Sequence, residues 1–513
     1  MRISSSVKNA TTSFISNIIV IIVGFIAQTL FIKLLGTEYL GINGLFTNII
    51  SMLGIVELGL GSAITYNLYK PLVTNNKELV KSLMAFYKKS YIIIGFIVLF
   101  IGIILTPFIY GFTDNLTIDV NLYLIFMLFI IDIFLSYMLS YKRTILYADQ
   151  KEYALNIIHM GYLIVLNITQ ITFLYLTHNY YYYLLVKIIM HAIESLIINH
   201  IANIKYSYLK EKNIDKLDSD IEKNIFKNVK ALFAHKIGTF VINGTDNIII
   251  SKFIGIATVG LYSNYYLIIN SVQILFNQII SSVTSSVGTM LITESREKQF
   301  DIFKKVRFLN FWIACFSGIS IYILIDNFVA IWIGKEFILP LQVLMVLILN
   351  YYQIIMRSSY ISFKSAAGIF YEDRFVPIIE SLINIIASII LLQYFGLAGV
   401  FMGTVISSLI LWCYSYPKYV YKKLFNRSYI DYTKENIGYL ILFIIIITTT
   451  SITAKSIFFD SMIVMLLIKG LICLIIPNLI LLLIFRKNQN FKYFASLIVS
   501  QIFIKIIHKR KLI

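Results

Sequence analysis

The sequence predicts an all-α polytopic membrane protein, and its composition, hydropathy and charge distribution each support that fold class. Of the 513 residues, 58% are hydrophobic and only 14% are charged, and the mean hydropathy is +0.81. Soluble domains carry about 25% charged residues, so a soluble fold is excluded. About fourteen segments have the roughly 20 mostly apolar residues that a membrane-spanning helix requires.

The first six predicted helices form an N-terminal bundle over residues 1–202. The first helix is about as long as a membrane span and many others follow it, so we expect it to be retained rather than cleaved as a signal peptide. A charged stretch, 203–228, comes next and is predicted to be a cytoplasmic linker. The six helices are predicted at 12–34, 42–69, 91–110, 121–141, 153–176 and 180–201.

A second six-helix bundle is predicted over 229–416, and two additional transmembrane helices over 417–485. The remaining residues, 486–513, are predicted to be a basic cytoplasmic tail. A tail helix on the membrane surface is favoured over a spanning one, because spanning would place the basic cluster 509–511 outside. The helices are predicted at 229–251, 260–291, 308–333, 341–368, 375–394, 397–416, 437–458 and 461–485.

The basic residues are distributed unevenly between alternate loops. The chain carries 44 Lys and Arg and a net charge of +18. Most of them lie in both termini and in one set of loops, whereas the alternate loops are short and nearly free of Lys and Arg. This positive-inside pattern predicts that both termini are cytoplasmic. It accounts for the net charge without nucleic acid as a partner, while membrane lipids remain one. The basic loops are 70–89, 142–151, 205–230, 296–307 and 418–434.

Several signatures of enzymes and metal proteins are absent from the sequence. Cys315, Cys413 and Cys473 lie in apolar runs without metal-ligand spacing, so neither a disulfide framework nor a metal site is predicted. The sequence contains no P-loop, H-E-x-x-H or G-x-S-x-G motif. No long outer loop is predicted that would hold a catalytic site. We therefore expect a protein that is not an enzyme and that has no resident cofactor.

A short motif occurs twice and suggests two related halves. Residues 33–36 read Lys-Leu-Leu-Gly and are followed by Gly41 and Ile42. Residues 252–255 read Lys-Phe-Ile-Gly and are followed by Gly260 and Leu261 at the same spacing. We interpret each copy as a glycine-bounded turn between two membrane helices.

Polar and ionisable residues align on single faces of several apolar helices. A charge inside the bilayer costs at least about 2.5–3.5 kcal/mol, so such residues usually face the bundle interior and mark function. Together they favour a water-filled central cavity. The aligned residues are Lys236, Asn243, Asp246 and Asn247; Asn270 and Asn277; Asn350, Gln353, Arg357, Tyr360 and Lys364; and Lys187, His191 and Glu194, with single acids at Glu57, Asp132 and Glu380.

Structural roles for these residues are the alternative. Amides and hydroxyls often join membrane helices by hydrogen bonds. Lys187 and Glu194 could form a structural ion pair, and Lys364, near a helix end, could extend toward the interface. Arg357 differs from these, because it lies in the middle of its predicted helix.

Several short segments form an ordered series that covers the first twelve predicted helices: 35–41, 44–46, 57–63, 69–72, 235–238, 246–247, 260–265 and 394–400. In their order and spacing these segments resemble the Wzx-type polysaccharide flippases of bacteria. This family belongs to the multidrug/oligosaccharidyl-lipid/polysaccharide exporter superfamily. Fourteen helices also occur in the lipid II flippases of this superfamily, but arginines typical of their first two helices are absent here.

The resemblance implies a fold and an activity. The fold is two six-helix bundles in a V, as in MATE transporters, here with two extra C-terminal helices. The activity is translocation of undecaprenyl-diphosphate-linked oligosaccharide units from the inner to the outer leaflet, for capsule, O-antigen or related polymers. Partners would be the lipid-linked glycan and a polysaccharide polymerase with its chain-length machinery. The alternatives are a cation-coupled drug antiporter of the same superfamily and a membrane polysaccharide polymerase.

We assign hypothetical roles to the aligned residues on this basis. The bases would contact the diphosphate, since cationic side chains offset the cost of moving an anion through a low dielectric. The amides and Tyr360 would contact sugars, and three acids would couple transport to a proton or sodium gradient. The predicted bases are Arg357, Lys187, Lys236 and Lys364, the cavity residues are Asn243, Asn247, Asn270, Asn277, Gln353 and Tyr360, and the coupling acids are Glu57, Asp246 and Glu380.

Overall fold

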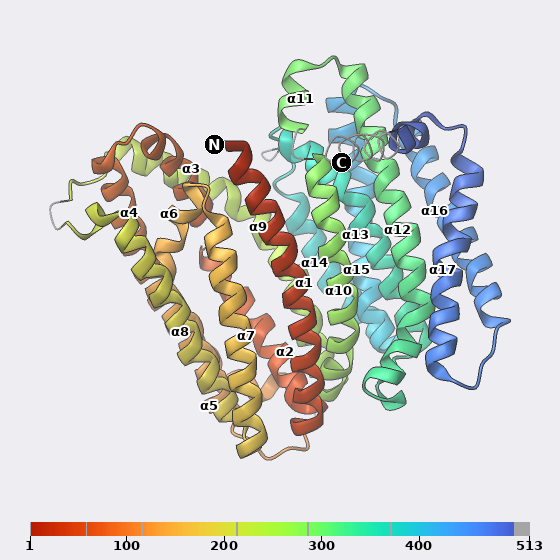
Figure 1. Ribbon diagram of the computed structural model, residues 1–513, viewed down its shortest axis with the longest axis horizontal. Coiled ribbons are helices and arrows are strands. Elements are labelled where there is room, and N and C mark those ends of the chain that lie inside the picture. Colours follow the sequence, from red (N-terminus) through yellow and green to blue (C-terminus); the bar gives the residue numbers. More distant parts are fainter. Residues whose placement is uncertain are drawn as a thin grey trace, which may run out of the picture. The chain divides into compact units, whose positions relative to one another are not determined.

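The structure, a computed structural model, describes residues 2–57, 59–113, 116–211, 214–284, 287–369 and 372–496 (Figure 1). All regular elements in these ranges are helices, as the sequence predicts. Within some helices the backbone alone is described, chiefly at 2–10, 230–243 and 281–284. The chain divides into two compact units: unit 1 is Met1–Leu267 with Asp373–Ser407, and unit 2 is Ile268–Glu372 with Ser408–Ile513.

Unit 1 holds the first eight α-helices, α9 and the beginning of α10, together with α14 and most of α15. Helix α9 packs against α2 and α14, and α1 against α7. The elements are α1 (Arg2–Leu35), α2 (Thr37–Leu53), η1 (Gly54–Glu57), α3 (Leu60–Val73), α4 (Lys77–Leu105), η2 (Thr106–Phe112), α5 (Leu122–Leu139), η3 (Ser140–Lys142), α6 (Arg143–Ala148), α7 (Glu152–Thr177), α8 (Tyr180–Lys205), η4 (Ser207–Lys210), α9 (Ser219–Phe253), α10 (Ile256–Thr284), α14 (Val376–Phe395) and α15 (Leu397–Ile410).

Unit 2 is built around α12, which packs against α13, α16 and α17. Helix α15 continues into unit 2 as the wider π-helical segment η6, which contains Pro417. The elements are the remainder of α10, α11 (Val287–Thr293), α12 (Arg296–Trp332), η5 (Lys335–Phe337), α13 (Leu341–Ala366), η6 (Leu411–Leu424), α16 (Tyr429–Lys455) and α17 (Met462–Phe485).

Each predicted membrane segment overlaps a helix, and among the described residues eleven helices are long and apolar enough to cross a membrane. The segments at 229–251 and 260–291, on α9 and α10, are not among the eleven. The predicted helix 42–69 is wrong as a single element. Glycines break it into α2 and α3, of 17 and 14 residues, so neither reaches the length of a span.

Residues 203–228 are more ordered than the predicted linker. Helix α9 begins inside this stretch at Ser219, where the Asp218 side chain accepts a hydrogen bond from the amide of Asp220 at 3.0 Å. The residues that precede α9 contact α4, because Nζ of Lys81 on α4 lies 2.8 Å from the carboxylate of Glu211. The division into two units also falls elsewhere, since it separates Leu267 from Ile268 within α10.

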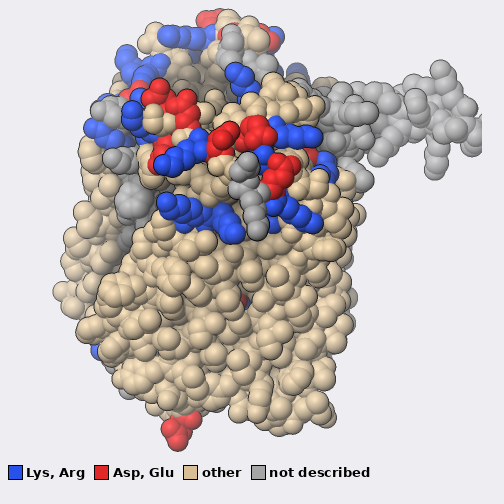
Figure 2. Space-filling model, turned by 90° about the vertical axis from the view of Figure 1, so that its left-hand side faces the viewer, with Lys and Arg blue, Asp and Glu red and all other residues tan. Residues whose placement is uncertain are grey.

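The charged residues of unit 1 gather at one end of its helices. Helix α4 begins and α8 ends within the basic segments 77–89 and 205–223, and α7 begins directly after the basic segment 142–151. Figure 2 shows Lys, Arg, Asp and Glu concentrated near the top of this face, above a broad band with few charges. The band is suited to lipid tails and the charged end to water and headgroups. We call this end the basic end.

The two copies of the repeated motif face each other in unit 1. Gly36 and Gly255 both have positive φ, 89° and 129°, and α2 and α10 begin directly after them. A Cβ atom on Gly41 would lie 2.0 Å from the carbonyl oxygen of Ile256, and one on Gly260 would lie 2.1 Å from that of Thr37. The backbones therefore approach so closely that only glycine fits at both positions.

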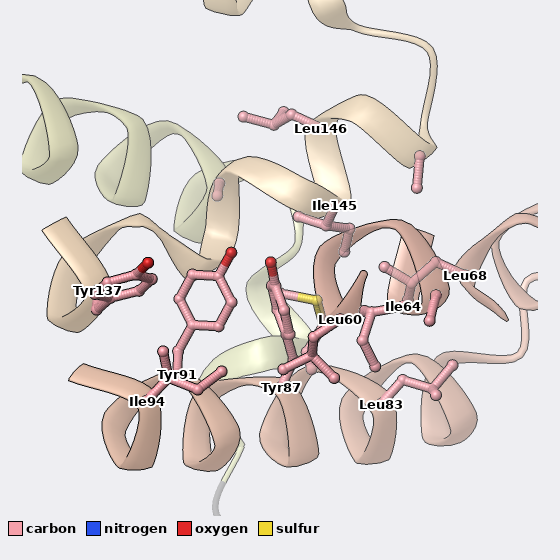
Figure 3. Packing of buried hydrophobic residues seen from close by; sticks show 14 of the residues in the cluster. Leu60, Ile64, Leu68, Leu83, Tyr87, Tyr91, Ile94, Tyr137, Ile145 and Leu146 are labelled. Carbon is pink, nitrogen blue, oxygen red and sulfur yellow. The ribbon is translucent and has the colours of Figure 1, made fainter. Parts of the chain in front are cut away.

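A tyrosine-rich core lies between α3, α4 and α5 (Figure 3). The rings of Tyr87 and Tyr91 have centroids 4.3 Å apart, and the ring of Tyr137 packs edge-on against Tyr91 at 5.5 Å. Ile64 from α3 and Ile145 from α6 are fully buried in the same cluster. This core holds the broken segment α2–η1–α3 against the rest of unit 1.

We expect Gly260→Ala to lower the stability of the protein. The added methyl group would collide with the backbone of Thr37, and overpacking of this kind costs about 1–3 kcal/mol. The matched control is Gly161→Ala on α7, where a Cβ would meet no described atom within 4 Å. Thermal unfolding of the purified protein in detergent should show a lower midpoint for the first variant only. Equal midpoints would show that the crossing tolerates a methyl group.

Candidate functional site

The chain between α2 and α3 is irregular. Helix α2 ends at Leu53, and one turn of 3₁₀-helix leads to Glu57. Gly59 has φ 89° and ψ −12°, a left-handed conformation that favours glycine. At membrane depth, interrupted helices are tolerated where they are buried in protein or line a water-filled cavity. The break is therefore a candidate location for a functional site.

A cavity of about 790 Å³ lies beside this break. Its wall comes from η1, α3, α4, η3, α6 and the first residue of α7, all in unit 1. Most of the lining residues carry a hydroxyl group, and the others include charged side chains. The lining residues are Gly54, Glu57, Gly59, Gly61, Ser62, Thr65, Tyr66, Tyr69, Tyr87, Tyr91, Ser140, Arg143, Thr144, Tyr147 and Glu152.

Glu57 is held in this cavity by the tyrosine core. The Tyr91 hydroxyl donates a hydrogen bond to its carboxylate, and Thr144 Oγ1 donates to the hydroxyl of Tyr87 at 3.1 Å. A Cβ atom on Gly61 would lie 3.4 Å from the Glu57 carboxylate and 3.1 Å from the Tyr87 hydroxyl. The small residue at 61 therefore leaves room for the acid and the ring.

Arg143 is the cation of the cavity, and the sequence analysis placed it in a basic loop. It opens α6 at the basic end, and its side chain is 31% exposed. Its Nη2 atom lies 3.1 Å from the carboxylate of Glu194 but is not aligned for a hydrogen bond, and Nε has no acceptor. Two buried guanidinium donors thus stand without described acceptors beside an open volume. Anionic oxygens are the natural partners of such donors.

Two ionic clusters extend from the cavity between α5, α7 and α8. Glu194, which is 3% exposed, forms ion pairs with Arg143 and, at 3.0 Å, with His159. Asp132 lies 2.9 Å from His191 and 3.4 Å from Lys187. The structural ion pair between Lys187 and Glu194 that the sequence left open as an alternative is therefore not the one that the described side chains form. Although the two residues share a helix face, each finds a closer partner on a neighbouring helix.

A second polar cluster in unit 1 surrounds Asp246. Thr404 Oγ1 donates to its carboxylate at 3.4 Å and accepts from Asn384 at 3.0 Å. Oδ1 of Asp246 and Oδ1 of Asn247 are both buried and meet no described donor. Glu380, one helical turn before Asn384, is 6% exposed. The cluster presents oxygen atoms, which suit a proton or a hard cation.

The remaining predicted site residues are spread over the chain. Lys236 and Asn243 fall outside the described side chains. In unit 2, Arg357 is partly buried and Lys364 is 9% exposed. The structure brings Glu57 to the cavity of unit 1 and places Asp246 close to Asn247. Of the predicted bases with described side chains, Lys187 lies in unit 1 and the other two lie in unit 2.

The predicted amides and Tyr360 in unit 2 occupy different surroundings. Gln353 accepts a hydrogen bond from Ser408 at 2.5 Å. Tyr360 is fully buried, and its hydroxyl donates to Asn436 at 2.9 Å. Asn270 is partly buried and Asn277 is exposed. Of these residues, Asn277 has the freest access to a ligand.

Arg307 is a second arginine that sequence reasoning assigned to a loop. It lies on α12, is 2% exposed, and pairs with Glu435 and Tyr421 of unit 2. Its guanidinium carbon is also 5.2 Å from the ring centroid of Tyr439. Hydropathy gave no signal for Arg143 or Arg307, because each directly adjoins an apolar run and resembles a loop boundary.

The fold agrees with those of known transporters. A lipid II flippase, MurJ, in an inward closed conformation aligns with TM-score 0.60 and 15% identity over 93% of this chain and 99% of its own. An inward-facing multidrug resistance MATE family transporter of the MOP superfamily gives 0.59 and 15% over 76% and 91%. A MOP superfamily transporter from Pyrococcus furiosus gives 0.53 and 15% over 79% and 92%. The chain therefore has the MOP superfamily fold.

The sequence identifies the protein family. No curated protein matches the chain. The family model described as polysaccharide biosynthesis protein matches residues 6–285. This match covers the break between α2 and α3, the cavity of unit 1 and both copies of the glycine motif. Because it spans more than half of the chain, the protein belongs to the polysaccharide biosynthesis protein family.

Proposed function

We propose that this multi-pass membrane protein is a flippase for undecaprenyl-diphosphate-linked oligosaccharide units. It would move them from the inner to the outer leaflet of the bacterial cytoplasmic membrane, for a capsule, O-antigen or related surface polysaccharide. In this proposal the protein is a transporter and not an enzyme, and both termini are cytoplasmic. The observation that carries the proposal is the cavity of unit 1, with the unpartnered donors of Arg143 in its wall.

The chemistry of the cavity fits the head of such a lipid. A volume of about 790 Å³ is within the range of about 300–1,000 Å³ typical of small-molecule sites. Tyrosine, serine and threonine hydroxyls can exchange hydrogen bonds with sugar hydroxyls. The Arg143 guanidinium can bind a diphosphate through two N–H groups. The apolar tail needs no polar path and can remain in the bilayer.

The position of the cavity also supports an inner-leaflet substrate. Arg143 lies between α5 and α7, within the basic segment 142–151 that the positive-inside rule assigns to the cytoplasm, and Glu152 directly follows that segment. A headgroup anchored in the inner leaflet would enter the protein at this end. Transport would then require alternating access, which in related architectures comes from rocking one helical bundle against the other.

The four bases predicted from the sequence keep their proposed role as diphosphate contacts. Arg357, Lys236 and Lys364 would bind the anion at other stages of transport. Lys187 is already 3.4 Å from Asp132, so its charge is partly compensated. Arg143 joins this set. We place it first, because the structure shows its unsatisfied donors beside an open volume.

Asp246 is the preferred candidate for coupling to a proton or sodium gradient. Its carboxylate has one buried oxygen without a described donor, and the oxygens of Asn247 and Thr404 lie on neighbouring parts of the same cluster. Glu57 and Glu380 remain alternatives. Binding of a cation there would alter contacts between α9 and α15, and such a change is what a coupled transporter requires.

A cation-coupled antiporter for small drugs is the second candidate. It is favoured by the two acids in the cavity wall, Glu57 and Glu152, which would attract a cationic substrate. A membrane polysaccharide polymerase is the third and less favoured candidate. Arg143 distinguishes the flippase from the antiporter, because a site for cationic drugs would gain affinity for them if the positive charge of this residue were removed.

We expect Arg143→Ala to abolish or strongly reduce display of the surface polymer. The loss of charge-assisted hydrogen bonds worth about 1.5–3 kcal/mol should weaken substrate binding roughly 10- to 100-fold. Arg143→Lys should be intermediate, since it keeps the charge but loses the planar fork. Arg357→Ala should also abolish display. Display on cells and the amount of protein in the membrane are measured together.

The matched control is Lys142→Ala, because Lys142 neighbours Arg143 but bonds to Asn203. A second variant, Arg143→Ala with Glu194→Gln, removes the charge of the buried carboxylate that the single variant leaves with His159 as its remaining described partner. If this double variant is as abundant as the wild type and displays normal polymer, Arg143 is not part of the site. Improved drug resistance in the single variant would favour the antiporter.

We expect Asp246→Asn to uncouple transport from the ion gradient. Asparagine has the size of aspartate and can accept from Thr404, but it neither titrates nor carries charge. In proteoliposomes, an imposed sodium or pH gradient should accelerate flipping by the wild type and have at least about fivefold less effect on the variant. Asp220→Asn, an exposed acid on α9, is the control. An unchanged response would assign coupling elsewhere.

A further inference from the structure

Unit 2 contains a second polar cavity, of about 500 Å³, at one end of α12, α16 and α17. Helices α12 and α16 begin near it and α17 ends beside it. It lies wholly within unit 2, and the proposed transport mechanism does not use it. The lining residues are Lys304, Arg307, Lys434, Glu435, Gly438, Tyr439, Leu442, Phe485, Asn488, Gln489 and Asn490.

The charge in this cavity is unbalanced. Three bases, Lys304, Arg307 and Lys434, line the cavity with a single acid, Glu435, which already pairs with Arg307. Lys304 also lies 3.9 Å from Asp301, an acid outside the lining. The guanidinium is almost completely buried, and its Nε atom has no described acceptor. Lys434 is exposed and forms no ion pair with any described residue. The cavity therefore has positive charge in excess, and an anion would compensate it.

A rigid turn supplies neutral hydrogen-bond donors to the same cavity. Directly after α17, the amide of Asn488 donates to Phe485 and that of Asn490 donates to the Asn488 side chain, both at 2.8 Å. The turn is fixed to α12, because the ring of Phe491 stacks on that of Trp312 at 5.7 Å. The amide side chains of this turn therefore form an ordered part of the cavity wall.

The remaining wall is apolar and open. Leu442 and Phe485 line it, and a Cβ atom on Gly438 would meet no described atom within 4 Å. A free inorganic anion would gain nothing from this surface. A phospholipid would use both parts of the cavity, with its phosphate on the bases and its glycerol and first methylene groups on the apolar wall.

We propose that this cavity binds the phosphate-bearing headgroup of an anionic glycerophospholipid. Basic pockets between membrane helices at the headgroup level are suited to such lipids, and lysine and arginine bind phosphate through charge-assisted hydrogen bonds. The bound lipid would join α12 to α16 and α17 at one end of unit 2. It would thus fix the two C-terminal helices to the rest of this unit without being transported.

The test measures retention of lipid by the purified full-length protein, using native mass spectrometry in detergent. Phosphatidylglycerol is compared with phosphatidylcholine, whose head has no net charge. We expect the wild type to retain phosphatidylglycerol about tenfold better. Lys434→Ala should reduce this preference about tenfold, the loss expected for one charge-assisted hydrogen bond. Gly438→Leu, which fills the cavity, should abolish it.

Lys422→Ala removes an exposed lysine of unit 2 outside the cavity, and it should retain the lipid as the wild type does. Equal retention by the wild type and Gly438→Leu, or equal retention of both lipids, would overturn the proposal. Displacement by inorganic phosphate alone would assign the cavity to a free anion, and preferential retention of undecaprenyl diphosphate would assign it to the substrate; either result overturns the phospholipid assignment. Because no step measures polymer display, failure here leaves the proposed flippase activity untouched.

Discussion

The close crossing of α2 and α10 is the contact on which the arrangement of unit 1 depends. At Gly41 and Gly260, each backbone approaches a carbonyl of the other helix, so neither helix can move or rotate without a collision. Small residues at such contacts are the usual means of packing membrane helices, because lipid provides no hydrophobic force between them. The crossing fixes the start of α2, and the chain then reaches the break at residues 54–59 in a defined position.

Unsatisfied buried polar atoms distinguish candidate sites from structural contacts. Most buried polar groups in folded proteins have a hydrogen-bond partner. Here Gln28 donates to Asn264 and Asn156 donates to Ser13, so these polar residues join helices. Arg143, Asp246 and Arg307 each keep at least one buried atom without a described partner. Two of them line cavities. A buried polar atom without a hydrogen-bond partner lowers the stability of the protein unless a ligand supplies that partner. We therefore base both proposals on these atoms.

The fold was largely predictable from the sequence, whereas the site was predictable only in part. Spans of apolar residues predict the helices because the bilayer demands them, and the asymmetry of Lys and Arg predicts their orientation, which stays a prediction. The glycine motif was recognised as a repeat, but its mutual contact requires the three-dimensional structure. Helical periodicity placed Lys187 and Glu194 on one face correctly, yet it could not reveal Asp132 and Arg143 on neighbouring helices as their nearer partners. Periodicity describes one helix at a time, and ion pairs here form between helices.

The two arginines that hydropathy assigned to loops share a physical explanation. A charge at the centre of the bilayer is expensive, whereas the cost falls toward the interface. Arg143 and Arg307 lie where apolar runs meet basic segments, so each can be buried among protein groups at a smaller cost than a mid-membrane charge such as Arg357 would have. This level is also where phosphates of membrane lipids are found. A protein that handles lipid headgroups therefore gains most from arginines at the edges of its helices, where a hydropathy profile draws no distinction between a loop and a binding site.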